Sequence, residues 1–127
     1  MAWIQDVVFD CAHPASLARF WAAAVDGYRV APYDEAELER LRGKGIFDVE
    51  DDPTVLVEPV DDGRPRMFFQ LVAERKAVKN RVHLDLRAED ADAEKERLTG
   101  LGATIVAEFE GHTLLADPEG NEFCLMR

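Results

Sequence analysis

Apolar and polar positions alternate most strictly along residues 80–87, where every second side chain is apolar. A period of two over this length is typical of a β-strand with one face buried. The apolar side chains would pack against a helix, while His83 and Asp85 would lie together on the opposite face. Residues 4–11 show a similar alternation, with Asp6 on the more polar face. We therefore expect two strands that each present polar groups away from the core.

Two other stretches have helical spacing instead. Apolar residues within 17–25 recur at intervals of three and four, which predicts an amphipathic helix with Trp21 in the core. Pro14 suits the first turn of that helix, and Gly27 is placed to end it in a left-handed conformation. Residues 89–99 form the second predicted helix, and glycines follow it as well.

The remaining chain is divided into short strands and one charged insertion. Strand-forming runs are predicted at 28–31, 54–60, 66–73, 103–107, 113–116 and 121–126. Residues 34–42 predict a polar helix with few apolar anchors, which we interpret as a surface insertion or lid. The acidic run 50–52 is interpreted as a solvated loop.

The order strand, helix, three strands thus occurs twice along the chain. Residues 1–75 and 78–127, approximately, would each form one βαβββ unit, although few residue identities repeat. The predicted fold class is α+β, with the two modules in tandem forming a single domain over residues 1–127.

Composition excludes several classes of function. The chain has 26 acidic and 15 basic residues among its 127, a formal net charge of −11 at pH 7. This balance argues against nucleic acid and against an anionic membrane surface as partners. The sequence contains neither a signal peptide pattern nor an apolar run long enough for a membrane span. Cys11 and Cys124 form no CxxC pair, which fits reduced thiols and a cytoplasmic location.

Four sequence pieces together resemble the vicinal-oxygen-chelate superfamily of glyoxalases, bleomycin-resistance proteins and dioxygenases, and most closely its glyoxalase-like domains. These pieces are VVFDCAHPASLARFW (7–21), NRVHLDL (80–86), LGA (101–103) and DPEGNEF (117–123). The resemblance implies an open, cup-shaped mixed sheet of eight strands with the helices outside and a ligand on the concave side. It also implies a homodimer, because members of this superfamily often complete their cups across a twofold interface.

Metal-dependent members of this superfamily place one ligand on the first and last strands of each module. The matching positions here are Asp6, Gln70, His83 and Cys124. His83 and Gln70 agree with the usual ligand types, whereas Asp6 stands where histidine is common and Cys124 where glutamate is common. A carboxylate that moves a proton in the superfamily's reactions is therefore missing at Cys124.

This departure favours an unknown small organic molecule bound in the cup, without a typical catalytic metal and with no cofactor. The alternative is a lyase, isomerase or dioxygenase-like enzyme that uses a divalent metal held by His83 and Gln70. A third hypothesis, a protein-interaction domain, rests on the charged insertion at 34–42.

Further residues could line the predicted cup. Phe47, Phe68 and Met126 are candidates, although packing in the interior explains them nearly as well. Asp85 would either bind His83 or line the cup itself.

Overall fold

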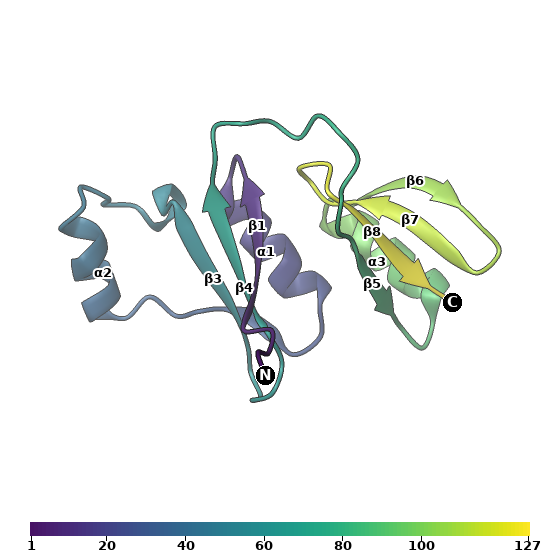
Figure 1. The fold of residues 1–127 in the computed structure, drawn as a ribbon, viewed down its shortest axis with the longest axis horizontal. Coiled ribbons are helices and arrows are strands. Elements are labelled where there is room, and N and C mark those ends of the chain that lie inside the picture. Colours follow the sequence, from purple (N-terminus) through teal and green to yellow (C-terminus); the bar gives the residue numbers. More distant parts are fainter. The chain divides into compact units, whose positions relative to one another are not determined.

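The computed structural model describes residues 1–127, and the chain divides into two compact units (Figure 1). Module 1 comprises Met1–Arg75 and module 2 comprises Lys76–Arg127. Module 1 contains β1 (Asp6–Cys11), α1 (Pro14–Ala24), β2 (Tyr28–Val30), α2 (Glu35–Arg42), the 3-10 helix η1 (Val49–Asp51), β3 (Thr54–Pro59) and β4 (Arg66–Leu71). Module 2 contains β5 (Leu84–Arg87), α3 (Ala91–Leu101), β6 (Thr104–Glu108), β7 (His112–Ala116) and β8 (Glu122–Met126).

The predicted α+β tandem of βαβββ units is confirmed, with four strands in each module. The strand orders are β1-β4-β3-β2 and β5-β8-β7-β6. In both sheets the first and last strands of the module pair in parallel, and the other pairs are antiparallel. Because the order and the directions coincide, the repeat found in the sequence is a repeat of topology.

The core of module 1 lies between α1 and one face of its sheet. Trp21 is 1% exposed and its ring lies 5.2 Å from that of Phe9. Phe9 in turn stacks on Phe69 at 4.8 Å. Burying such a side chain stabilises the fold by about 1.5–3 kcal/mol. The opposite face of this sheet, which we call the open face of module 1, carries the alternate residues, among them Asp6, Val8, Asp10, Thr54, Leu56, Arg66, Phe68 and Gln70.

Module 2 is built in the same way around α3. Leu98 of α3 is fully buried together with Leu115, Phe123 and Leu125 of the sheet. The alternate residues of β5 and β8 form the open face of module 2, where Asp85 lies opposite Cys124.

The first strand of module 2 is shorter than its alternation predicts. β5 begins at Leu84, so the predicted strand 80–87 loses its first half, and Val82 is 78% exposed. Asn80 explains the late start, because its backbone N–H donates to the Glu122 carboxylate (3.3 Å) and its side chain donates to the Glu122 carbonyl (3.4 Å). These bonds hold the entering chain outside the regular ladder.

Gly27 has the predicted left-handed backbone, with φ of +74°, but it does not end the helix. α1 stops at Ala24, where the next N–H, that of Val25, bonds to the carbonyl of Trp21. Gly27 serves the turn into β2 instead. The Arg64 guanidinium binds its carbonyl so closely that a Cβ at Gly27 would collide with it.

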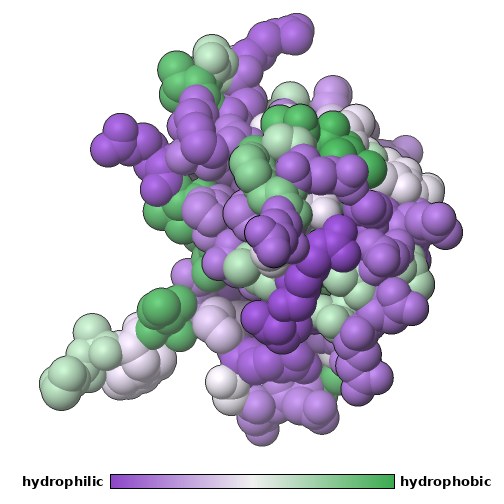
Figure 2. Space-filling model, turned by 90° about the vertical axis from the view of Figure 1, so that its right-hand side faces the viewer, coloured by the Kyte–Doolittle hydropathy of each residue, from purple (hydrophilic) through white to green (hydrophobic).

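None of the helices is long and apolar enough to cross a lipid bilayer. On the surface seen in Figure 2, hydrophilic side chains predominate and apolar ones form small groups between them.

Candidate functional site

The insertion between β2 and β3 is ordered by its own polar groups. Asp34 caps α2 by accepting the N–H of Glu37 at 2.9 Å. One turn further on, Arg40 donates to the Glu37 carboxylate at 3.0 Å. Leu41, at 2% exposed, is the one buried side chain of α2. The predicted polar helix is thus confirmed, with a single apolar anchor.

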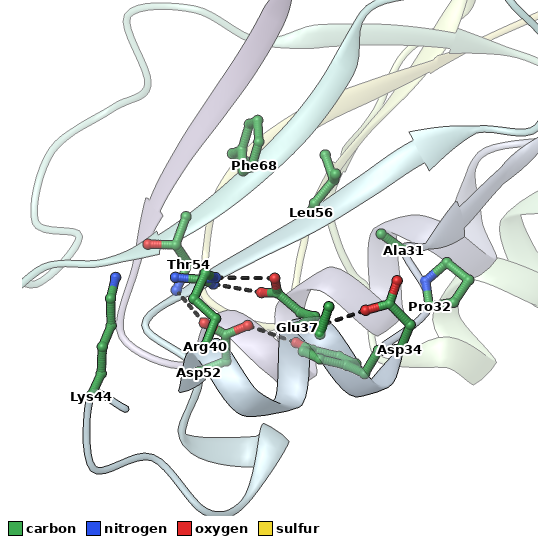
Figure 3. A pocket seen from close by; sticks show the side chains of 12 residues that line it. Ala31, Pro32, Asp34, Glu37, Arg40, Lys44, Asp52, Thr54, Leu56 and Phe68 are labelled. Carbon is green, nitrogen blue, oxygen red and sulfur yellow. Dashed lines mark hydrogen bonds and ion pairs between the residues drawn. The ribbon is translucent and has the colours of Figure 1, made fainter. Parts of the chain in front are cut away.

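A pocket of about 790 Å³ lies between this insertion and the open face of module 1 (Figure 3). Leu56 and Phe68 supply apolar surface from β3 and β4, and Thr54 adds a hydroxyl beside them. Side chains of the insertion line the other side, among them Tyr33, Glu37, Arg40 and Lys44. The site therefore combines an apolar surface with a charged rim, as ligand pockets generally do.

Tyr33 and Asp52 tie the two ends of the insertion together. The Tyr33 hydroxyl donates to Asp52 at 2.7 Å, and the other Asp52 oxygen accepts the N–H of Thr54 at 3.0 Å. Asp52 is only 3% exposed, so the interpretation of 50–52 as a solvated loop is wrong for this residue. Burial and the neighbouring Asp52 carboxylate raise the pKa of Tyr33 far above its ordinary value. Tyr33 therefore remains a neutral donor under ordinary conditions.

Lys44 differs from the other charged groups of the rim. Glu37 and Arg40 neutralise each other, and the hydrogen bonds from Arg40 lower the pKa of Glu37. The charge of Lys44 also lowers the pKa of Glu37, but Lys44 forms no ion pair. Its ammonium group is consequently available to an anionic group of a ligand.

The other predicted site residues of module 1 are held by partners on its open face. Both carboxylate oxygens of Asp6 accept from Arg66, at 2.8 and 3.2 Å, and these bonds lower the pKa of Asp6. Gln70 donates its amide to Asp10 at 2.8 Å. A metal ion bound to Asp6 would have to displace the Arg66 guanidinium or lie next to its positive charge. The four-ligand metal set of the superfamily therefore does not fit the residues of this chain.

Module 2 brings three donor side chains together on its open face. The potential ligand atoms of His83, Asp85 and Cys124 all lie within 4.8 Å of one another. His83 Nε2 is 3.3 Å from Asp85 Oδ1, so Asp85 is a partner of His83, one of the two roles expected for it. Cys124 is 7% exposed, and burial, the charge of Asp85 and a hydrogen bond with Asp85 raise the pKa of its thiol. A neutral thiol of this kind is a poor nucleophile.

The remaining predicted residues are dispersed. Phe68 lines the pocket of module 1, whereas Phe47 lies between α2 and η1 with 81% of its surface exposed. Met126 is half-buried in β8, opposite His112 and Arg87. No common site for these side chains is formed within either module.

Sequence reasoning missed the pocket residues of the insertion, namely Tyr33, Asp34, Glu37, Arg40, Lys44 and Asp52. The charges of 34–52 were visible, but a charged helix is usually a solvated surface. The pattern contains no sign that Tyr33 would reach Asp52.

Comparison with known proteins relates this architecture to solved structures. A fosfomycin resistance protein, FosX from Mesorhizobium loti, matches over 99% of this chain and 91% of its own, with a TM-score of 0.68 and 16% identity. A glyoxalase/bleomycin resistance protein/dioxygenase family enzyme from Burkholderia phytofirmans matches over 98% and 97%, with a TM-score of 0.64 and 17% identity. The glyoxalase I of Leishmania major matches over 100% and 87%, with a TM-score of 0.62 and 14% identity.

These identities establish a shared fold and nothing finer. No match was found among the sequences of curated proteins. The family model of the glyoxalase-like domain, however, matches residues 6–126, which is nearly the whole chain and includes both modules. The protein therefore belongs to the family of glyoxalase-like domains.

Proposed function

We propose that this protein binds a small organic molecule in the pocket between α2 and the open face of module 1. The observation that carries the proposal is the pocket itself, whose volume of about 790 Å³ lies within the usual range for ligand sites, about 300–1,000 Å³. Binding in this pocket requires no metal. This agrees with the Asp6 carboxylate, which is already paired with Arg66.

The lining indicates the chemistry of the ligand. Leu56 and Phe68 offer a flat apolar surface suited to a ring or a branched hydrocarbon. Lys44 is the one cation of the rim without an ion-pair partner, whereas Arg40 is neutralised by Glu37. The ligand would therefore have an apolar body that carries a carboxylate or another anionic group.

The known structures of this fold support a small-molecule role in general terms. They include a fosfomycin resistance protein and a trypanothione-dependent glyoxalase I, whose names each refer to a small molecule. Neither ligand is transferred to this chain, because the identities of 16% and 14% are too low for that.

A metal-dependent lyase, isomerase or dioxygenase-like enzyme remains the second candidate function. The grouping of His83 with Asp85 and Cys124 favours it. The bonds of Asp6 to Arg66 oppose it, because the superfamily's reaction centre needs ligands from both modules.

Isothermal titration with two ring probes of opposite charge tests the proposal. We expect 1-naphthoate to bind the full chain and 1-naphthylmethylamine to bind at least about tenfold more weakly, a difference of about 1.4 kcal/mol. Phe68→Ala should weaken naphthoate binding, and Lys44→Met should remove the preference for the anion.

Val8→Ala is the matched control for Phe68→Ala. Val8 lies opposite Phe68 on the same open face and is 51% exposed, but it does not line the pocket. Naphthoate binding that is equal in Phe68→Ala and the wild type, or absent from the wild type, would contradict the proposal.

A further inference from the structure

We infer that the ligand of the module 1 pocket is a zwitterion, with an apolar body, an anionic group at one end and an ammonium group at the other. This inference rests on the proposed function and adds to the ligand a second charge of opposite sign. The residue that selects for the ammonium group is Asp34, which lines the same pocket as Lys44.

Two of the charged side chains that line the pocket have no ion-pair partner in the protein. Glu37 and Arg40 form a pair with each other. Asp52 is only 3% exposed and already accepts two hydrogen bonds. Asp34 and Lys44 remain, and neither forms an ion pair. One oxygen of Asp34 accepts the N–H of Glu37 at 2.9 Å, and its other oxygen is left for a donor of the ligand.

These two side chains lie at opposite ends of the pocket. Asp34 directly precedes α2 and Lys44 follows it, and the eight residues of the helix span about 12 Å. Figure 3 shows Lys44 and Asp34 on opposite sides of the view, with Leu56 and Phe68 lining the pocket between them. Since the lysine side chain is flexible, the two charges are separated by on the order of 10 Å. The ligand must therefore be extended, with its charges far apart.

The charges of α2 have the same polarity as the two ends of the pocket. Its first turn contains Glu35 and Glu37, and its last turn contains Arg40 and Arg42. Such a distribution complements the helix dipole, whose positive end is the N-terminus. The two glutamates thereby offset the positive charge that would otherwise repel an ammonium group beside Asp34.

The two ends should contribute unequally to binding. Asp34 shares its carboxylate with the first N–H groups of α2, whereas Lys44 has no such partner. The anionic group of the ligand therefore gains more from Lys44 than the ammonium group gains from Asp34. An amine that lacks an anionic group should accordingly bind weakly, and the ammonium group should strengthen a ligand that Lys44 already holds.

Isothermal titration of the full chain at neutral pH with two biphenyl probes tests the inference. Both probes are biphenyl-4-carboxylates; the 4′ position carries an aminomethyl group in one and an ethyl group of nearly equal size in the other. We expect the aminomethyl probe to bind at least about threefold more tightly, an effect of the size usual for an exposed ion pair. The ratio of the two affinities is the informative quantity, because the contributions of Lys44 and of the rings cancel in it.

Asp34→Asn removes the negative charge but keeps a side chain that caps helices equally well. The preference for the aminomethyl probe should disappear in this variant, while the ethyl probe should bind as in the wild type. Glu35→Gln is the matched control, because it removes a neighbouring negative charge that does not line the pocket and is paired with Arg42. The preference should persist in Glu35→Gln.

The outcomes distinguish this inference from the function on which it rests. If the wild type binds neither probe, the pocket is not a ligand site and both proposals fail. If the ethyl probe binds at least as tightly as the aminomethyl probe, the zwitterion is ruled out while the binding function stands. A preference for the aminomethyl probe that is equal in the wild type and Asp34→Asn would also overturn the inference, because the ammonium group would then not be recognised by Asp34.

Discussion

The two modules share one topology but use their open faces differently. Module 1 pairs its polar groups internally, Asp6 with Arg66 and Gln70 with Asp10, and adds an insertion that makes a pocket. Module 2 has no such insertion and groups His83 with two other donors. The scaffold is thus the same, while the chemistry depends on a few side chains placed on it.

The polar pairs across the parallel strands show this difference most clearly. In each module an aspartate on the first strand faces a polar residue on the last strand: Asp10 faces Gln70, and Asp85 faces Cys124. The amide of Gln70 satisfies Asp10 without any ligand. A thiol is a weaker hydrogen-bond donor than an amide, and Cys124 lies in one group with Asp85 and His83.

The largest expected effect concerns what the modules have in common, their aromatic cores. Phe69 and Phe123 are both fully buried on β4 and β8. Phe69→Ala and Phe123→Ala should each lower the free energy of unfolding by about 3–5 kcal/mol, because each leaves a cavity. Urea unfolding followed by circular dichroism measures the loss, and Trp21 fluorescence reports on module 1.

Phe47→Ala is the control for these core variants. Phe47 is 81% exposed, so its removal should change stability by less than about 0.5 kcal/mol. A loss below about 1 kcal/mol in either core variant would show that the module concerned is not organised around its phenylalanine.

A smaller effect is expected where module 1 alone has the insertion. Asp52→Ala leaves the Tyr33 hydroxyl and the Thr54 N–H without their acceptor. The cost should be about 1–3 kcal/mol, the usual penalty for an unsatisfied buried polar group. Naphthoate affinity should fall as well, because Tyr33 is released from its position in the pocket wall. Unchanged stability would mean that the insertion is held by Leu41 alone.

The fold could be predicted from the sequence because its signals are local and repeated. Alternation gave the strands around Val7 and Phe69, helical spacing placed Trp21 in the core, and the order of elements revealed the tandem. The start of β5 was missed because Asn80 is held by Glu122, a residue 42 positions away. Pattern reasoning does not detect such a bond.

The candidate sites were predicted less completely, for a similar reason. Asp6 and Arg66 are 60 residues apart, so nothing local indicates that the carboxylate is already occupied. Asp52 belongs to an acidic run whose other members are exposed, so the sequence gives no sign that this residue is buried. His83 and Asp85 were identified because they are two residues apart in one alternating stretch, which predicts a common face, and they do lie together although β5 begins only at Leu84.

The pH dependence of stability should distinguish the insertion from the rest of the chain. The pKa of Tyr33 is raised in the folded protein, so its contribution to stability is complete below its ordinary pKa, about 10, and is lost as the pH rises above that value. The difference in unfolding free energy between the wild type and Tyr33→Phe should therefore shrink above about pH 10. Lysine ionisation affects both proteins equally and cancels in this difference. A difference that is constant from pH 8 to 11 would contradict the bond to Asp52.

The smallest expected effect is a change in one titration, and it bears directly on the contrast between the open faces. Hydrogen bonds from Arg66 hold the pKa of Asp6 below its ordinary value. In Arg66→Met the pKa of Asp6 should rise toward its ordinary value, as followed by NMR of the side-chain carboxyl carbon. Arg29→Met breaks the similar pair with Glu58 and should leave Asp6 unaffected. If Asp6 titrates alike in both variants, its carboxylate is not held by Arg66. The contrast between the open faces would then not rest on the pairing of Asp6 with Arg66.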